Sequence, residues 1–291
     1  MAAETSNAQI LATLLLQHQP CLVLTGAGVS SESGLGTYRD DKGEWMRKQP
    51  ITAQAFLGSL AARQRYWARS YVGWQDFNRA RPNANHQVLL QLKQLGLLTG
   101  LVTQNVDGLH TLAGHPGVID LHGTIHEVKC MDCNRTTQRS LYQQQMLSAN
   151  PRLEFLTGSS APDGDSDLDG DNQFDWLQPP ACNHCAGVMK PDVVFFGENV
   201  VRDKVDQVYS LLDKSQMLLI VGSSLMIFSG YRFARRAKES GKQLAILNRG
   251  VTRADELADV LINQESSEIL SQALNLIQQQ ATDPGFKPHL T

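Results

Sequence analysis

The sequence predicts an α/β fold built around a parallel sheet. A short apolar run, Leu22 to Leu24, is long enough for one buried strand, and the glycine-rich turn Gly26-Ala27-Gly28 follows it. Three further apolar runs, Leu98–Thr103, Met217–Val221 and Gln243–Leu247, also end in small or polar residues. Helical patterns separate the runs. Such an alternation is typical of a parallel sheet, in which ligands lie outside the carboxyl ends of the strands.

The helices are predicted from apolar periodicity and from their ends. A first helix is expected over Thr5–Gln19 and is ended by Pro20. Another is expected over His86–Leu95, capped by the segment Asn83-Ala84-Asn85 and closed by Gly96. From about residue 40 to 81 the chain is rich in arginine and aromatic residues at helical spacing, which predicts a helical insertion beside the cleft. Most of its aromatic side chains are expected in the core: Trp45, Phe56, Tyr66, Trp67, Tyr71, Trp74 and Phe77.

The glycine turn favours a site for pyrophosphate, because the N–H groups after a strand can bind phosphate oxygens. It departs from the turn of ordinary dehydrogenases at Ser31, where a third glycine would fall. The acidic residue that would hold an adenosine ribose is also missing, since Asp40 and Asp41 follow no apolar strand. Taken alone, the turn fits equally well a strand-to-helix connection without a ligand.

The composition is that of an ordinary globular protein. The chain has 291 residues, of which 42% are hydrophobic and 19% charged, and this length suggests about two domains. A formal net charge of -3 gives no support for nucleic-acid binding. No apolar stretch approaches the roughly 18 residues of a membrane span, and the first residues do not resemble a targeting signal. We therefore expect a cytoplasmic enzyme.

Four of the five cysteines form two Cys-x-x-Cys pairs, which predict a metal site rather than disulfides. Cys130 and Cys133 form one pair, and Cys182 and Cys185 form the other. Four thiolates complete the tetrahedral coordination of zinc and leave no open position, so the zinc is expected to be structural. The fifth cysteine, Cys21, begins the first strand and is expected to be a small buried apolar residue.

The motifs together resemble those of the sirtuin family, the NAD-dependent protein-lysine deacylases, from about residue 20 to 270. They are Gly26-Ala27-Gly28-Val29-Ser30, Ser33-Gly34, Tyr38-Arg39, Thr103-Gln104-Asn105-Val106-Asp107, Leu121-His122-Gly123, the two cysteine pairs, Val194-Phe195-Phe196-Gly197-Glu198 and Gly222-Ser223-Ser224-Leu225. Three segments resemble the class II branch: Tyr66-Trp67-Ala68-Arg69, Val72-Gly73-Trp74 and Lys190-Pro191-Asp192-Val193-Val194. One departure is Gly36, where the family usually has proline.

The resemblance implies a large Rossmann-like domain and a small zinc-binding domain. The expected boundaries are residues 1–125 for the first part of the NAD-binding domain, 126–190 for the zinc-binding domain and 191–291 for the second part of the NAD-binding domain. The resemblance also implies a cleft in which NAD+ and an acyl-lysine peptide meet. The products would be nicotinamide and O-acyl-ADP-ribose.

Residue roles follow from the same resemblance. It implies that His122 is the general base that deprotonates a ribose hydroxyl, because imidazole accepts a proton near neutral pH. Asn105 and Asp107 are expected to contact the nicotinamide ribose and carboxamide. The expected NAD+ contacts are Gly26, Ala27, Gly28, Ser30, Ser33, Tyr38, Arg39, Gln104, Asn105, Val106, Asp107, His122, Gly222, Ser223, Ser224, Asn248, Arg249, Gly250 and Ser266. Structural roles are expected for three other histidines: His110, His115 and His126.

Two segments are expected to contact the substrate. The segment Val194-Phe195-Phe196-Gly197 resembles one that pairs with the peptide backbone by strand addition. Tyr66 and Arg69 lie three positions apart on one helical face and resemble the pair that binds the carboxylate of succinyl- or glutaryl-lysine. The alternative is that Tyr66 packs in the helical insertion while Arg69 is solvated or paired with an acid.

Other functions share parts of these motifs. Mono-ADP-ribosylation of proteins would begin by breaking the same nicotinamide–ribose bond. A Rossmann oxidoreductase would instead leave intact NADH, and a zinc-ribbon binding module would release no product. The expected partners are acyl-lysine proteins or peptides, without nucleic acid or membrane, and the protein is expected to be a monomer.

Overall fold

The computed structural model describes residues 5–37, 40–44, 50–160, 166–168 and 173–281. The helices are α1 Asn7–Gln17, α2 Ala53–Gly58, α3 Leu60–Arg79, α4 Ala84–Gln94, α5 Leu109–Leu112, α6 Arg139–Ala149, α7 Arg202–Asp213, α8 Phe228–Glu239 and α9 Ser266–Ala281. The strands are β1 Cys21–Thr25, β2 Leu98–Thr103, β3 Ile119–Asp120, β4 Gly123–Cys130, β5 Thr136–Gln138, β6 Gly158–Ser160, β7 Ser166–Leu168, β8 Met189–Val193, β9 Met217–Val221, β10 Gln243–Leu247 and β11 Val260–Ile262.

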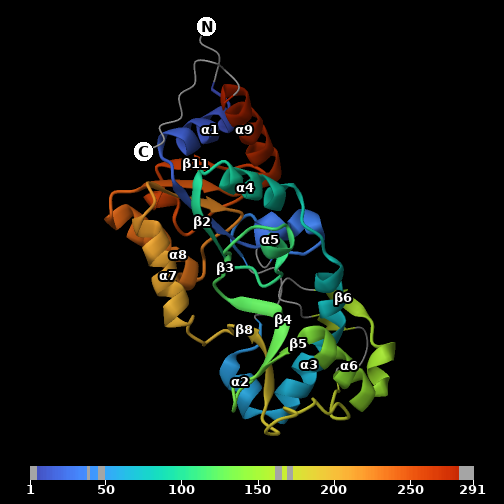
Figure 1. Cartoon of the computed structure of the whole chain (residues 1–291). Coiled ribbons are helices and arrows are strands. Elements are labelled where there is room, and N and C mark those ends of the chain that lie inside the picture. The colour runs from blue at the N-terminus through green and yellow to red at the C-terminus, as the bar shows by residue number, and fades with distance from the viewer. Residues whose placement is uncertain (1–4, 38–39, 45–49, 161–165, 169–172, 282–291) are drawn as a thin grey trace.

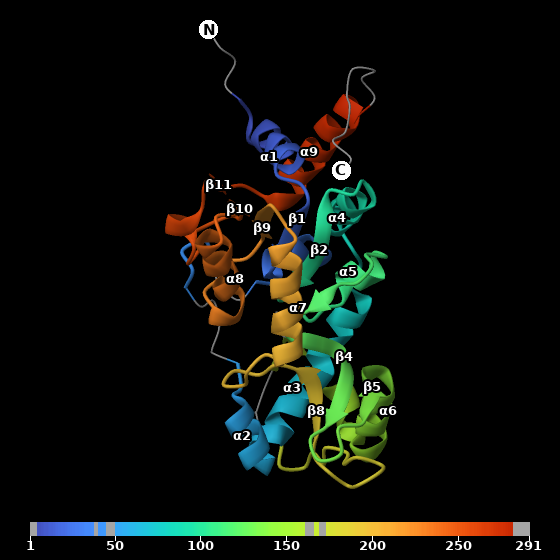
Figure 2. The same cartoon turned by 60° about the vertical axis from the view of Figure 1, so that its left-hand side comes forward.

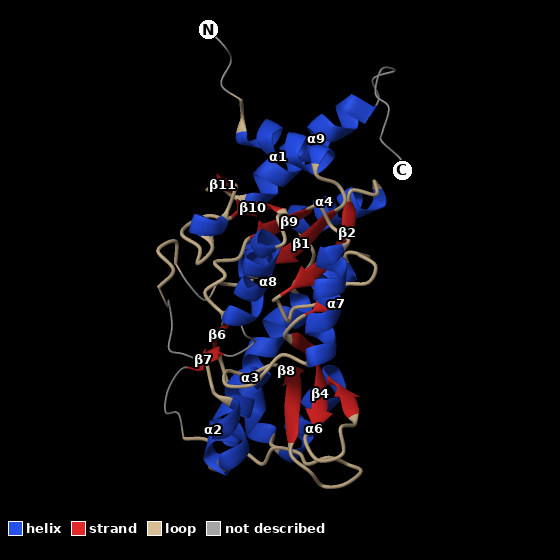
Figure 3. Ribbon diagram, turned by 90° about the vertical axis from the view of Figure 1, so that its left-hand side faces the viewer, coloured by secondary structure: helices blue, strands red, loops and turns tan. Residues whose placement is uncertain are grey.

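A six-stranded parallel sheet forms the large part of the molecule, in the order β11-β10-β9-β1-β2-β3. Numbered along the chain within this sheet, the order is 3-2-1-4-5-6, that of a dinucleotide-binding fold. The direction of the order reverses between β1 and β9. Figure 3 shows this sheet above the smaller one that contains β4 and β8. The expected Rossmann-like parallel sheet is confirmed.

Each central strand contributes side chains to two separate cores, because successive residues of a strand point to opposite faces. Cys21 and Val23 of β1 pack in the core formed with α1, α4 and α9. Leu22 and Leu24 pack on the other face, with α7 and α8. Figures 1 and 2 show α1, α4 and α9 at the upper end and α7 beside α8 along one side. Both faces are thus covered, which explains why the strands are uniformly apolar.

The small part is built on an antiparallel sheet in the order β5-β4-β8. Its core includes α2 and α3, which come from the aromatic segment before residue 81, and α6. The expected burial of the aromatic residues is confirmed where the structure describes them: Phe56, Tyr66, Trp67, Tyr71, Trp74 and Phe77 are all buried. Trp45 lies outside the described residues.

The predicted elements of the large sheet are found with small shifts at their ends. The bounds of β2, β9 and β10 are those predicted, and β1 adds one residue at each end. α1 begins after Ser6, which forms a capping box with Gln9, and α4 begins at Ala84 because Asn83 caps it. The proposed domain boundaries stay a prediction. Among the described helices, none has the length and apolar character needed to cross a membrane.

Candidate active site

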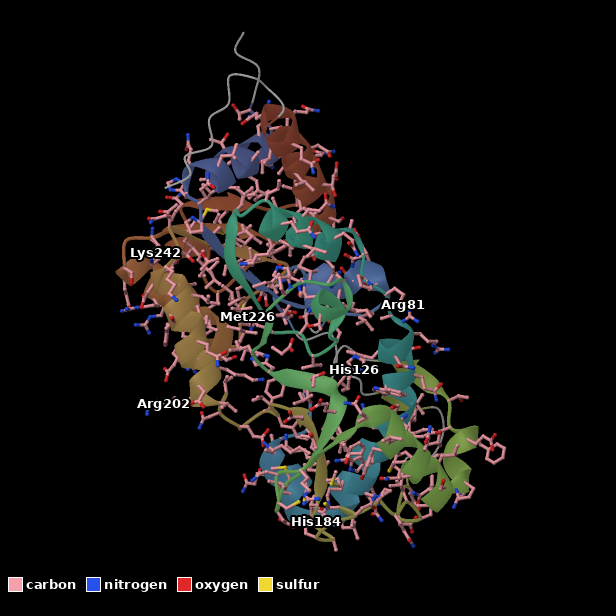
Figure 4. All side chains as sticks on the ribbon, in the orientation of Figure 1. Arg81, His126, His184, Arg202, Met226 and Lys242 are labelled. Atoms are coloured by element: carbon pink, nitrogen blue, oxygen red, sulfur yellow. The ribbon has the colours of Figure 1, made fainter. Side chains whose placement is uncertain are left out.

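A cavity of about 1000 Å³ lies where the carboxyl ends of β1, β2, β9 and β10 converge. Met226, labelled near the centre of Figure 4, is one of the residues that line it. Most of the expected site residues also line it: Gly26, Ala27, Gly28, Ser30, Gln104, Asn105, Val106, Asp107, His122, Val194, Phe195, Phe196, Gly197, Gly222, Ser223, Ser224, Asn248, Arg249 and Ser266. The polar residues that end these four strands therefore share one crevice.

The two glycine turns at the floor of the cavity pack directly against each other. The N–H groups of Gly26 and Gly28 donate to the carbonyl oxygens of Val221, at 3.1 Å, and Gly222, at 2.9 Å. A Cβ on Gly28 would lie 2.8 Å from Cα of Gly222, and a Cβ on Gly26 would lie 2.7 Å from Cβ of Ser223. Glycine is required here because the turns after β1 and β9 share this space.

Asp107, which is 5% exposed, fixes the polar groups beside this turn. Its carboxylate accepts hydrogen bonds from Ser30 Oγ at 2.7 Å and from the Leu109 N–H at 2.9 Å. The Asn105 amide donates in turn to the Gly26 carbonyl oxygen, at 3.0 Å, and to Ser30 Oγ, at 3.1 Å. The end of β2 is thus linked to the turn after β1. His126, labelled in Figure 4, donates from Nε2 to the Asp107 carbonyl oxygen at 2.8 Å.

His122 is held in an orientation that leaves one ring nitrogen, Nε2, unprotonated and able to act as a base. Nδ1 lies 2.9 Å from the carbonyl oxygen of Gln104, which only accepts, so the proton resides on Nδ1. Nε2 therefore accepts the hydrogen bond from Ser229 Oγ at 2.7 Å. Burial lowers the pKa of His122 to about 4, and the charge of Lys204 acts in the same direction against the opposing hydrogen bond to Gln104. The imidazole is neutral at physiological pH.

The segment after β8 forms the opposite wall of the cavity and is held by a partly buried ion pair. Lys190, 5% exposed, contacts Glu198 at 3.0 Å. The same carboxylate oxygen accepts the Phe195 N–H at 2.7 Å, and the Lys190 ammonium lies 4.3 Å from the centre of the Phe195 ring. The Val194 N–H donates to the carbonyl oxygen of His122 at 2.8 Å. The wall is thereby attached to the residue that carries the candidate base.

Arg249 closes the end of the cavity near β10. It forms ion pairs with Asp41, at 3.0 Å, and with Glu265. The backbone continues this contact, since the Val251 N–H donates to the carbonyl oxygen of Asp41 at 3.0 Å. Gly250 has a φ of +90°, and a Cβ there would lie 2.4 Å from the same oxygen. This turn therefore needs glycine to pack against Asp41.

The four paired cysteines come together at the far end of the small sheet, and none of them lines the cavity. Their sulfur atoms all lie within 4.8 Å of one another, with 3.5 Å between Cys130 and Cys185 and 3.7 Å between Cys133 and Cys182. Tetrahedral zinc with Zn–S bonds of about 2.3 Å places sulfurs about 3.8 Å apart, so the cluster fits a structural zinc. Figure 4 shows His184 at this end of the molecule.

Comparisons with known proteins agree with this geometry. A model of the Sir2 family matches residues 26–229. The chain is 46% identical over 275 residues to an NAD-dependent protein deacetylase of Bordetella bronchiseptica, covering 94% of this chain and 100% of the relative. It is 48% identical over 269 residues to one of Xanthomonas campestris, covering 92% of each. The chain belongs to the Sir2 family.

A solved structure of a Sir2 protein with a p53 peptide and NAD+ has the same fold. It superposes with a TM-score of 0.71 at 25% sequence identity, covering 94% of this chain and 98% of the solved one. The sirtuin resemblance inferred from the motifs is thus confirmed.

Some expected site residues do not line the cavity. Ser33 accepts a hydrogen bond from the Asn83 amide at 2.9 Å, and Gly250 forms the turn described above. Tyr66 is 7% exposed and packs against Phe195, with 5.2 Å between ring centres. Arg69 Nε donates to the carbonyl oxygen of Ser166 at 2.7 Å. Two expected NAD+ contacts lie outside the described residues: Tyr38 and Arg39.

Sequence reasoning missed Ser229 as a partner of His122. The two residues are far apart in the chain, and only the fold brings the first turn of α8 to the connection between β3 and β4, where His122 lies. Asp41 and Glu265 were missed as partners of Arg249 for the same reason. An acid in a polar stretch carries no local signal that it will face a distant arginine.

Three buried histidines lie behind Asp107 and the β1 turn, and each has a lowered pKa. The rings of His86 and His110 are 4.7 Å apart, and those of His110 and His115 are 6.5 Å apart. His110 Nε2 lies 3.0 Å from Thr25 Oγ1, at the end of β1. Burial is the main cause of the lowered pKa in all three, most strongly in His110, whose neighbours His86 and His115 add repulsion. The structural role expected for His110 and His115 agrees with this burial.

Acidification should therefore destabilise the fold through His110. Below pH 6.5 the unfolded chain binds protons that folded His110 resists, so the free energy of unfolding falls as pH falls from 6.5 towards the folded pKa. His110→Gln should reduce the loss of stability between pH 7 and pH 5 by up to about 2 kcal/mol. Denaturant melts of both proteins at each pH measure this difference, in which the titrations of groups that do not interact with His110 cancel. An equal loss in both proteins would contradict the prediction.

Loss of one zinc ligand should remove metal and stability together. Cys130→Ser should lower the zinc content and reduce Tm by about 5–10 °C, because a structural zinc contributes folding free energy directly. Activity should follow the folded fraction, since the cluster lies outside the cavity. Metal analysis and thermal melts give the two readouts. Cys21→Ala is the control and should retain zinc; a folded, zinc-free Cys130→Ser protein with full activity would refute a structural role.

Proposed function

We propose that the protein removes acyl groups from lysine side chains of proteins or peptides, consumes NAD+, and uses His122 as its general base. The Sir2 family membership and the two deacetylase relatives support the overall activity. When bound, NAD+ supplies the ribose that accepts the acyl oxygen and the nicotinamide that leaves. The assignment of individual residues is our own proposal and rests on the cavity.

The hydrogen bonding of His122 carries this assignment. Nδ1–H is committed to the Gln104 carbonyl, so Nε2 is the only ring atom that can take up a proton. Nε2 faces Ser229 within the cavity, and burial keeps the ring neutral. A base must be unprotonated before the proton transfer, and His122 meets that condition throughout the neutral pH range.

The residues around the two glycine turns fit NAD+. The carboxyl ends of parallel strands at the reversal of strand order form the usual place for a dinucleotide. We assign Asn105 and Asp107 to the nicotinamide ribose and carboxamide, since hydrogen bonds to Ser30 fix both side chains. Asn248 and Arg249, at the end of β10, would hold the adenosine side. Preorganised polar groups of this kind cost little reorganisation when the ligand binds.

The acyl-lysine peptide would lie along Val194–Gly197. This segment faces the cavity from the small sheet, and the Lys190–Glu198 pair fixes its backbone. An extended peptide can then add to it through main-chain hydrogen bonds. The lysine side chain would enter the cavity between this wall and the β9 turn, where His122 also lies.

Mono-ADP-ribosylation of proteins is the second candidate and is not favoured. Both deacylation and ADP-ribosylation begin with loss of nicotinamide, but the described relatives are deacetylases. A positioned neutral base also suits a reaction that needs one more deprotonation. A monomeric state, a cytoplasmic location and the lack of nucleic-acid binding stay predictions from the sequence.

Replacing the proposed base should separate chemistry from binding. His122→Ala should lower deacylation of an acetyl-lysine peptide by about 10²–10⁴-fold at pH 7, because a positioned base contributes about that factor. NAD+ affinity, measured by calorimetry, and Tm should change little. Ser229→Ala is the matched control, since it removes the partner of Nε2 but leaves the imidazole, and it should lose less activity. Near-normal turnover by His122→Ala would contradict the assignment of His122 as the general base.

The proposal extends to the kind of acyl group that the protein removes. We propose that Tyr66 and Arg69 hold the carboxylate of an acidic acyl group, since Tyr66 packs against Phe195, a residue that lines the cavity. Arg69→Met should then depress activity on glutaryl-lysine by about 10- to 150-fold while changing activity on acetyl-lysine far less. Steady-state rates on the two peptides measure this ratio. Equal losses on both would assign Arg69 to holding the Ser166 backbone instead.

A further inference from the structure

A second hollow opens beside the active-site cavity, between α7 and α8. Its volume is about 450 Å³. Six residues line it: Tyr209, Phe228, Arg232, Arg235, Arg236 and Glu239. Phe228 and Arg232 line the first cavity as well, so they form a wall shared by the two hollows. A substrate peptide that leaves the active site across Phe228 and Arg232 would enter the second hollow.

The positions of the lining residues along α8 show how far the second hollow extends from His122. Ser229, in the first turn of α8, contacts His122 Nε2. Phe228, Arg232 and Arg235 follow one another at helical spacings of four and three, which places them on one face. Arg235 lies six residues beyond Ser229, or about 9 Å along the helix axis. An extended peptide covers that distance in about three residues.

The hollow has an excess of positive charge. Three of its six lining residues are arginines and one is an acid. Arg235 and Arg236 contact Glu239 at 3.1 Å and Asp213 at 3.5 Å, but these side chains are about half exposed, and such pairs are weak. Arg232 has no acidic partner within the part of the chain that the structure describes, and its Nε is buried without a hydrogen bond there.

Phe228 adds an apolar surface close to two cations. It is 48% exposed, and its ring lies 5.2 Å from the Arg232 guanidinium and 6.0 Å from that of Arg253. Arg253 is fixed by a hydrogen bond to the carbonyl oxygen of Met226 at 3.3 Å. A half-exposed ring close to guanidinium groups suits a side chain with a short apolar stem and a carboxylate at its end. Glutamate and aspartate have that form.

We propose that this surface, formed by Phe228, Arg232, Arg235 and Arg253, binds an acidic side chain of the substrate about two to four residues from the acyl-lysine. The protein would thereby prefer acyl-lysine sites in acidic sequence. The inference rests on the proposed deacylase function and adds a sequence preference to it. Arg232 is its central residue, because it borders both hollows and carries the unpaired donor.

Matched peptides test this preference. Each contains one acetyl-lysine and a single glutamate placed two, three or four residues before or after it, and each has a glutamine counterpart. Nicotinamide release is measured over a range of peptide concentrations at saturating NAD+. At one or more positions on one side, glutamate should lower KM by about 3- to 10-fold relative to glutamine, with kcat unchanged. The ratio should shrink when the salt concentration rises from about 0.05 to about 0.5 M.

Variants then locate the effect. Arg235→Gln and Arg232→Gln should each bring the KM ratio of the paired peptides towards 1. Arg235→Glu should reverse the preference in favour of a lysine at the same position, a result that an unfolded protein cannot give. Arg79→Gln is the control for loss of a surface charge. Arg79 pairs with Asp76 on α3 and lines neither hollow, so its variant should keep the ratio.

The outcomes separate the inference from the function on which it rests. Normal turnover with equal KM for glutamate and glutamine peptides would overturn this inference alone. So would a preference that survives in Arg235→Gln and is not reversed in Arg235→Glu, because the acid would then be bound elsewhere. No nicotinamide release with any acetyl-lysine peptide or with its glutaryl-lysine counterpart would overturn the proposed deacylase function and this inference with it.

Discussion

The close approach of two backbone turns at the reversal of strand order is the constraint on which the active site depends. The turn after β1 and the turn after β9 are in direct contact, and Gly28 leaves no room for a Cβ against Gly222. The N–H groups of Gly26 and Gly28 each donate a hydrogen bond across this contact, which fixes the position of one turn against the other. A side chain in either turn would push the two central strand ends apart. The cavity floor would then lose its shape before any ligand contact was affected.

Hydrogen bonds link the two glycine turns to the side chains that we assign to the reaction. Ser30, in the turn after β1, holds Asp107, and Asn105 holds both Ser30 and the Gly26 carbonyl. Gln104 orients His122 through its carbonyl oxygen and accepts a hydrogen bond from Ser223 Oγ at 2.6 Å through its side chain. The turns after β1, β2 and β9 are thereby locked into one network. Buried networks of this type are stable only when most members are satisfied, which favours a single arrangement.

Much of this arrangement was accessible from the sequence because it is encoded locally. Buried parallel strands are continuous apolar runs in the sequence. The bounds of β9 and β10 coincide with the ends of two such runs. The cysteine spacing predicts the metal cluster for a similar reason, since two residues between ligands are enough to shape each half of the site. The expected cavity residues around Gly26 and Asn105 also lie at strand ends, where the pattern itself predicts a ligand.

Contacts between distant segments were not accessible in this way. Nothing near Ser229 in the sequence indicates that it will face His122, and the pairing of Arg249 with Asp41 and Glu265 depends on the folded turns. The residues Tyr66 and Arg69 show the converse limit. Their spacing predicts correctly that they share a helical face, but helical periodicity does not say which neighbour that face meets. Here Tyr66 meets Phe195 and the aromatic core of the small part.

His122 is one of the residues at which the two parts of the molecule meet, and this explains the glycine that follows it. Its side chain is fixed by Gln104 and Ser229 of the large part, whereas its carbonyl oxygen accepts the Val194 N–H from the wall beyond β8. Gly123 has a φ of +84°, and a Cβ there would lie 2.0 Å from the carbonyl oxygen of Asp192. Only glycine lets β4 begin so close to β8. The small sheet, with its metal cluster at the far end, therefore sets the backbone position from which the His122 side chain reaches the cavity.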